Sequence, residues 1–94
     1  MEVLIEFQGI SRVLVKSKKI PLKVEPATTY RQIIQRLAVL YPALVGEVIS
    51  KDRQTLLGSN MLSLNGKHMI RPSDLDNSPE AGDKLTLMSI LAGG

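Results

Sequence analysis

The last ten residues of the chain hold the group whose chemistry is easiest to define. An alternating apolar run, residues 85–91, predicts a strand, and Ala92, Gly93 and Gly94 follow it without side-chain bulk. Glycine weakens a strand and adds nothing to a core, but a backbone without Cβ can pass through a channel too narrow for other residues. The group that reaches the far end of such a channel is the α-carboxylate of Gly94. The simpler interpretation of this end is a frayed terminus or a remnant of cloning.

Chemistry at this carboxylate requires another protein. A carboxylate at neutral pH is a poor electrophile, because a nucleophile meets an anion and oxide is a poor leaving group. The chain contains no cysteine, so it brings no thiol nucleophile, no disulfide and no thiolate metal site. Its single histidine, His68, has no serine or cysteine partner in the pattern, and we interpret it as an exposed or edge residue. The sequence therefore predicts a carried group and not an enzyme, with no catalytic residue of its own.

Two further clusters have simpler explanations than a binding site. Four carboxylates lie in or beside the polar stretch 71–82: Asp74, Asp76, Glu80 and Asp83. Their spacing lacks the regular ligand order of a calcium loop, so we expect turn and cap residues and no metal site. The three methionines Met61, Met69 and Met88 are expected to fill the core, since methionine adapts to irregular gaps.

Length and charge indicate one small domain without affinity for nucleic acid or membrane. The 94 residues suffice for a single core, and no apolar run approaches the ~20 residues that span a bilayer. The net charge is +3, and basic residues gather at Arg12, Lys16, Lys18, Lys19 and Lys23. The three aromatic residues of the chain are too few for a base-stacking platform, so a solvated face or a dock for an acidic partner explains the lysines better. The acidic start has no basic leader, which predicts a cytoplasmic protein without a signal peptide.

Local patterns place a hairpin and a helix in the first half of the chain. Residues 3–7 form an apolar, β-branched run that predicts a strand. A second extended stretch is expected over residues 12–26, with a polar turn or bulge at 16–19 and with Pro21 at a sheet edge. Apolar residues then recur at helical spacing over residues 29–41, after a threonine cap and before Pro42.

The second half adds strands that complete a sheet. A short helical turn is expected among residues 44–49, and a hairpin of residues 61–64 and 67–70 around Asn65 and Gly66. The loop 71–82 should contain a turn near 73–75, and the final strand covers 84–91. One main helix packed across one face of a mixed sheet gives an α+β domain. If the final strand lies parallel beside the first, it is central and the arrangement is a β-grasp.

Alternation assigns the residues of the final strand to two faces of the sheet. Leu85, Leu87 and Leu91 are expected to face the core, and Thr86, Met88 and Ile90 to face the other side. Because the helix covers only one face, Met88 and Ile90 are predicted to be exposed apolar residues close to the tail. Together with Leu91 they form the expected partner-binding surface.

Four short segments carry a resemblance to a known family. They are residues 27–29 before a helix that ends at 40–42, the strand and turn 62–66, the entry 82–85 and the end 91–94. In this order they resemble the ubiquitin-like sulfur carriers of the MoaD/ThiS type, which include relatives of molybdopterin synthase small subunits and archaeal ubiquitin-like modifiers. Two departures fall on surfaces that choose a partner: Ser89 and Ile90 stand where the family often has a proline pair, and residues 16–19 are more basic than the family requires.

The resemblance implies a ubiquitin-like β-grasp domain over residues 1–91 and a flexible tail over 92–94. It implies that a separate enzyme of the ubiquitin-activating type adenylates Gly94 with Mg-ATP, while Gly93 and Ala92 serve as the slender linker. A sulfurtransferase would supply sulfur for a C-terminal thiocarboxylate, and the large subunit of a molybdopterin synthase is a candidate receiver. The chain itself would bind no cofactor.

Two other functions remain open from the sequence. The chain can be a protein modifier that is joined through Gly94 to lysines of its targets, which needs the same first activation step. It can also be a β-grasp docking module in which the glycine pair has no role. Removal of Gly93 and Gly94 separates the docking module from the other two functions.

Overall fold

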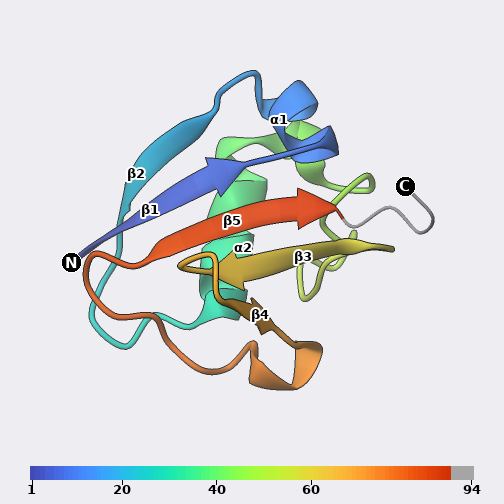
Figure 1. Cartoon of the computed structure of the whole chain (residues 1–94). Coiled ribbons are helices and arrows are strands. Elements are labelled where there is room, and N and C mark those ends of the chain that lie inside the picture. Colours follow the sequence, from blue (N-terminus) through green and yellow to red (C-terminus); the bar gives the residue numbers. More distant parts are fainter. Residues whose placement is uncertain (90–94) are drawn as a thin grey trace.

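The computed structural model describes residues 1–89 and shows a five-stranded mixed sheet with one long helix across one face (Figure 1). The strands are β1 Glu2–Phe7, β2 Lys19–Lys23, β3 Asn60–Leu64, β4 His68–Ile70 and β5 Lys84–Ser89. Their order in the sheet is β2-β1-β5-β3-β4. This confirms the predicted α+β class and the β-grasp arrangement.

Strand β5 lies in the centre of the sheet, as the sequence predicted. It pairs in parallel with β1, in a register that runs from Leu4↔Lys84 to Phe7↔Leu87. On its other side it pairs antiparallel with β3. Both edges of the last described strand are therefore bonded to neighbouring strands.

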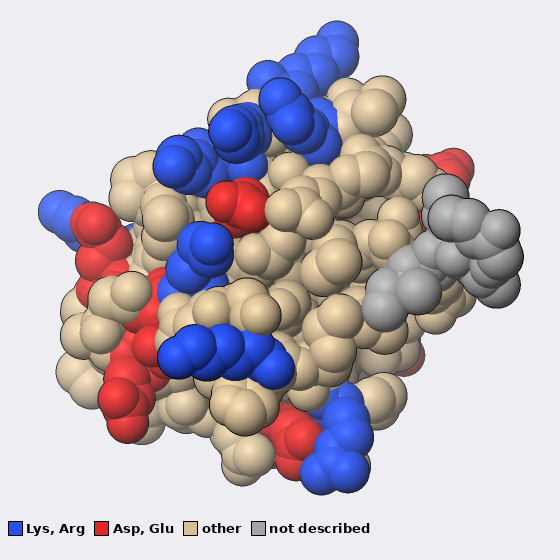
Figure 2. Space-filling model, in the orientation of Figure 1, with Lys and Arg blue, Asp and Glu red and all other residues tan. Residues whose placement is uncertain are grey.

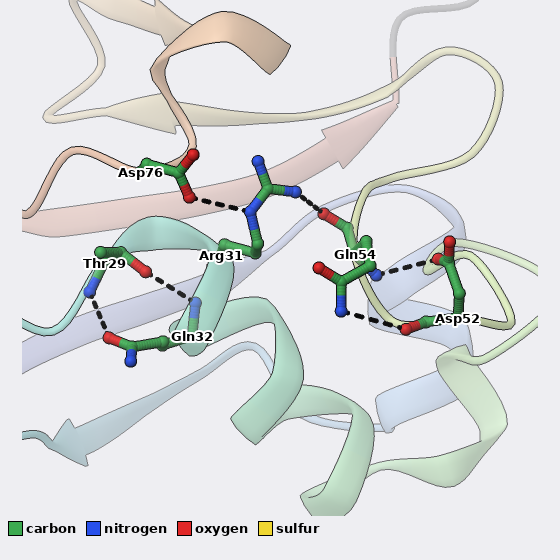
Figure 3. Close-up of polar contacts among 6 residues, drawn as sticks. All are labelled: Thr29, Arg31, Gln32, Asp52, Gln54 and Asp76. Atoms are coloured by element: carbon green, nitrogen blue, oxygen red, sulfur yellow. Dashed lines mark hydrogen bonds and ion pairs between the residues drawn. The ribbon is translucent and has the colours of Figure 1, made fainter.

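The long helix, α2 Tyr30–Leu40, follows from its cap and its apolar face. The Thr29 hydroxyl accepts from the backbone N–H of Gln32 at 3.1 Å, and the Gln32 side chain accepts from the N–H of Thr29 at 2.9 Å (Figure 3). This reciprocal pair satisfies two N–H groups that a helix start leaves unbonded. The expected span, residues 29–41, is confirmed to within one residue at each end. A 3₁₀ turn, Pro42–Leu44, follows the helix.

Arg31 ties the start of α2 to two loops. Its Nε donates to the Asp76 carboxylate at 2.9 Å, and its Nη1 donates to the backbone carbonyl of Gln54 (Figure 3). The guanidinium holds the pKa of Asp76 below its usual value through this hydrogen bond and its charge. The Ser50 hydroxyl donates a hydrogen bond to the Asp52 carboxylate at 2.6 Å and so lowers the pKa of Asp52, within the loop that presents Gln54. Asp83 accepts the backbone N–H of Glu80 at 2.8 Å, which is the turn role expected of it, whereas Asp76 and Asp74 form ion pairs with Arg31 and Arg71.

The stretch after β1 was predicted incorrectly. Residues 10–15 form a short helix, α1 Ile10–Val15, although the sequence predicted an extended stretch from residue 12 onward. Six residues with no side-chain cap and a β-branched composition give no local helix signal. The helix exists because Ser11 and Val15 are buried by tertiary packing. Strands β1 and β2 still pair antiparallel as expected.

The core lies between α2 and the inner face of the sheet. Its side chains include Ile33, Ile34 and Leu37 from α2 and Val3, Ile5 and Phe7 from β1, all at most 1% exposed. In the stretch 44–49, where one helical turn was expected, the turn comes earlier, but Leu44, Val48 and Ile49 join the core. Within residues 1–89, the helices are too short or too polar to cross a bilayer.

Candidate functional site

The predicted reactive end of the chain lies outside the described residues. This applies to Gly94, to the linker residues Gly93 and Ala92, and to the partner residues Ile90 and Leu91. The boundary expected between a domain of residues 1–91 and a tail of 92–94 lies outside them as well. The structure describes the root of the tail, which is the end of β5 at Met88 and Ser89.

The root is fixed at the carbonyl of Leu87. This oxygen accepts the backbone N–H of Gln8 at 3.0 Å and the hydroxyl of Ser11 at 2.9 Å. Ser11 is 1% exposed, and its hydroxyl also lies 3.0 Å from the carbonyl of Gln8. The chain after β1 thus continues the bonding of β5 beyond the last residue of β1. Sequence analysis did not single out Ser11, and its signal, a serine two residues after a glycine, is weak.

Gly9 allows the loop after β1 to lie close to the end of β5. Its φ of +69° is a left-handed conformation that favours glycine. A Cβ at this position would also lie 2.8 Å from the Ser89 hydroxyl oxygen. The glycine therefore serves both the turn into α1 and the approach of the loop to the end of β5.

The two faces of β5 differ in the way that alternation predicted, with one exception. Leu85 and Leu87 are fully buried against the core, and Met88 is half-buried on the outer face. Thr86 is on the outer face yet only 5% exposed. Its cross-strand neighbours are Glu6 on β1 and Ser63 on β3, and a central strand is flanked on both sides. Burial on the outer face therefore comes from neighbouring strands and not from a helix.

The methionines do not fill the core, so that prediction is wrong. Met61 and Met88 are directly opposite each other on β3 and β5, and Met69 on β4 is opposite Ser63. Met69 is 43% exposed, while Met61 and Met88 are half-buried. The inward-facing leucines fix the register, and the period of two then places the methionines on the outer face. We call Met61, Met69 and Met88 the methionine patch.

A mainly apolar hollow of about 230 Å³ borders this patch at the β4 edge of the sheet. Leu56, Pro72 and Leu75 contribute to its lining, together with Met61 and Met69. The surface over β3 and the end of β5 is largely uncharged in Figure 2, which shows the outer face of the sheet. Exposed apolar surface of this kind is typical of protein-binding sites, and methionine suits such sites because it is flexible and polarizable.

His68 lies on β4, the short edge strand, and is exposed, in line with its interpretation as an edge residue. Among residues 1–89, no three His, Asp or Glu side chains come together in the way that a metal site requires.

Comparisons with known proteins identify the fold. No protein-family model matches the chain, and no curated protein matches its sequence. The crystal structure of SAMP1, a small archaeal modifier protein of Haloferax volcanii, is 21% identical over 100% of both chains, with a TM-score of 0.82. Urm1 from Trypanosoma brucei is 24% identical over 99% of this chain and 95% of its own, with a TM-score of 0.73. A complex of subunits 1 and 2 of the molybdopterin-converting factor from Helicobacter pylori contains a chain with 20% identity, full coverage of both chains and a TM-score of 0.63. At these identities the similarity establishes the shared ubiquitin-like β-grasp fold.

Proposed function

We propose that this protein is a ubiquitin-like sulfur carrier whose C-terminal glycine, Gly94, is activated by a separate adenylating enzyme. The activated end is converted to a thiocarboxylate, which donates sulfur in the biosynthesis of a molybdopterin-like cofactor. The chain is the carried substrate of these steps and not their catalyst. The fold it shares with a small archaeal modifier protein and with the molybdopterin-converting factor complex supports this function.

The observation that carries the proposal is the position of β5. The strand is central, bonded on both sides, and fixed by two donors at the Leu87 carbonyl. The sequence then continues through only five residues, and the last three are alanine and two glycines. A narrow segment that starts from an anchored strand can deliver a carboxylate to an active site in another protein.

The chemistry proceeds in two stages. A carboxylate oxygen of Gly94 attacks the α-phosphorus of ATP and releases pyrophosphate, which leaves an acyl-adenylate. Mg²⁺ and basic groups of the partner stabilise the phosphate charge. The persulfide of a sulfurtransferase then attacks the acyl carbon, AMP leaves, and a thiol cleaves the resulting S–S bond to give the thiocarboxylate. Each sulfur nucleophile comes from a partner, because the chain has no cysteine.

The methionine patch is the proposed contact surface for these partners. It lies on the face of the sheet that α2 does not cover, and Met88 is one residue before the end of the described β5. A partner that binds there holds the domain next to the point where the tail begins. The Helicobacter pylori structure, a complex of subunits 1 and 2, supports a second protein subunit as the partner.

Intact-mass analysis tests the proposal. The full chain is incubated with ATP, Mg²⁺, a sulfur source and each adenylating enzyme of the source organism in turn. The expected product differs from the chain by one oxygen replaced with sulfur, and a variant without Gly93 and Gly94 should remain unchanged. If no adenylating enzyme changes the mass of the full chain, the carrier function is wrong.

A protein modifier is the second candidate, favoured by the similarity to SAMP1 and Urm1. In that case the same incubation with a cell extract should yield conjugates of higher mass, joined through Gly94 to lysine. Activity that survives the loss of both glycines would instead indicate a docking module.

A further inference from the structure

A group of positive charges lies at the end of the sheet where α1 joins β2. It consists of Arg12, Lys16, Lys18 and Lys19, which are all exposed, and we call it the basic edge. Figure 2 shows Lys and Arg side chains in a row along this border of the molecule, over α1 and β2. The ion pairs found within residues 1–89 are Arg31–Asp76 and Arg71–Asp74, so none of them involves the basic edge.

The facing carboxylates leave this charge mostly uncompensated. Of the four cations, only Lys19 has a carboxylate as its cross-strand neighbour, that of Glu6. Glu6 also accepts a hydrogen bond from the Gln8 side chain at 3.0 Å. Lys23, at the other end of β2, is opposite Glu2 and lines the same hollow as Glu2 and Glu25. The positive excess is therefore concentrated beside α1.

The backbone of β2 does not favour the addition of another strand. Lys18 and Val24 bond to β1 through their backbone groups, and alternation then turns the groups of Lys19, Pro21 and Lys23 outward. Pro21 has no N–H to donate, and Arg36 already occupies the carbonyl of Lys23 at 3.3 Å. Proline and lysine on an edge strand are known to prevent strand pairing. A ligand at this edge must therefore be held by side chains.

Apolar side chains next to these charges indicate a protein ligand. Val13, which follows Arg12 in the sequence, and Ile10, two residues before Arg12, are 73% and 46% exposed on α1. A single-stranded nucleic acid would need exposed aromatic rings on which its bases could stack. The described rings do not provide them: Phe7 and Tyr30 are buried, and the half-buried Tyr41 packs edge-on against Phe7 at 5.6 Å.

We propose that the basic edge, together with Val13 and Ile10, is a second docking surface for an acidic segment of a partner protein. The matching segment has Asp and Glu side chains on either side of an apolar residue, which contacts Val13. α1 packs against β5, and Ser11 of α1 bonds to Leu87. The segment therefore binds beside the root of the tail, toward β1 and β2, whereas Met61 and Met69 of the methionine patch lie on β3 and β4, on the other side of β5 in the strand order. This docking needs no chemistry at Gly94.

An NMR titration of the full chain tests this surface. The probe is a short peptide of glutamates around a central leucine, and the comparison ligand is a single-stranded RNA of equal charge. We expect the peptide to shift the backbone amide signals of residues 10–19. Its affinity should decrease when the salt concentration is raised from about 50 mM to about 300 mM, since screening weakens exposed charge pairs. Replacing the central leucine with serine should weaken binding to the full chain but not to a Val13→Ser variant.

Matched charge variants complete the test. The triple variant Lys16→Gln, Lys18→Gln, Lys19→Gln should bind the peptide about tenfold more weakly, since each exposed ion pair contributes a factor of roughly two. The control Lys51→Gln, Arg53→Gln, Lys67→Gln removes equal charge from exposed sites elsewhere and should change affinity less than about twofold. Equal losses of peptide affinity in both triple variants would mean that the attraction is non-specific, which overturns the proposal. Tighter binding of RNA than of the peptide to the basic edge would mean a nucleic-acid site and would overturn it as well. A variant without Gly93 and Gly94 should bind normally, so a failure of the carrier function is distinguished from a failure of this one.

Discussion

Ser11→Ala tests whether the root of the tail is anchored as the structure shows. The change removes the hydroxyl that donates to the Leu87 carbonyl at 2.9 Å in a site only 1% exposed. The carbonyl keeps the N–H of Gln8 at 3.0 Å, and the Gln8 carbonyl, which also lies 3.0 Å from the hydroxyl, belongs to an exposed residue, so neither acceptor is left buried without a partner. The loss is therefore that of one neutral hydrogen bond, about 1 kcal/mol, and not the larger penalty of an unsatisfied group.

Urea and thermal denaturation measure this loss. At constant m, we expect the free energy of unfolding to fall by about 1 kcal/mol and Tm to fall by about 4–8 °C for a domain of this size. The matched control is Ser73→Ala, at an exposed position in the loop after β4, and it should stay within about 0.5 kcal/mol of the original protein. Amide hydrogen exchange at Gln8, whose N–H donates to the same carbonyl, should be faster in Ser11→Ala and unchanged in the control.

Equal stabilities of the two alanine variants would refute the anchor. So would unchanged exchange at Gln8 in Ser11→Ala, because the Ser11 hydroxyl would then contribute nothing to the bonding at the Leu87 carbonyl.

Three further predictions concern the surroundings of β5 and α2. Gly9→Ala should destabilise the domain by about 1–2 kcal/mol, because φ is +69° and the added Cβ would lie 2.8 Å from the Ser89 hydroxyl oxygen; an unchanged free energy of unfolding contradicts this, and a loss that Ser89→Ala does not reduce assigns the effect to the backbone conformation alone. Met88→Asp should slow adenylation about tenfold or more with the fold intact by circular dichroism, whereas Val39→Asp, which replaces a 66% exposed apolar residue on α2, should not; equal rates would remove the methionine patch from the partner surface. Burial, and to a smaller extent nearby carboxylates, raise the pKa of Tyr30 above its ordinary value of 10.0, so the stability that the neutral side chain contributes is present below pH 10.0 and is lost as pH rises through the raised pKa. Phenolate absorbance of a variant with Tyr41 replaced by phenylalanine should show that Tyr30 titrates above pH 10.0, and titration at or below pH 10.0 contradicts the burial argument.

Local signals were strong enough to predict most of the elements. The threonine cap, the helical spacing of residues 33–41 and Pro42 are all close in sequence, and they place α2 correctly. The pair Asn65 and Gly66 both adopt positive φ, as the predicted hairpin turn requires. The order of the elements allowed the final strand to lie parallel beside the first, and the prediction of a central β5 depended on that condition, which the pairing with β1 meets.

The errors lie where tertiary packing overrides local preference. The apolar residues of α1 fit a strand as well as a helix, and burial against β5 decides between them. Alternation along the final strand placed Met88 on the outer face, but Met61 and Met69 were missed because hydrophobicity suggests burial, whereas the register with Leu62 and Leu87 places all three methionines on the outer face. Ser11 was missed because its partner, Leu87, is 76 positions away in the sequence. Contacts over such distances cannot be predicted from residue type and spacing.

ATP–pyrophosphate exchange tests the central claim most directly, because it reports activation of the Gly94 carboxylate before any sulfur chemistry. We predict that the chain ending at Gly94 stimulates ATP–pyrophosphate exchange by its adenylating enzyme. A chain extended by one alanine after Gly94, which keeps the whole domain but moves the carboxylate, should give no stimulation. Equal exchange with the extended chain, or none with either, would contradict the account.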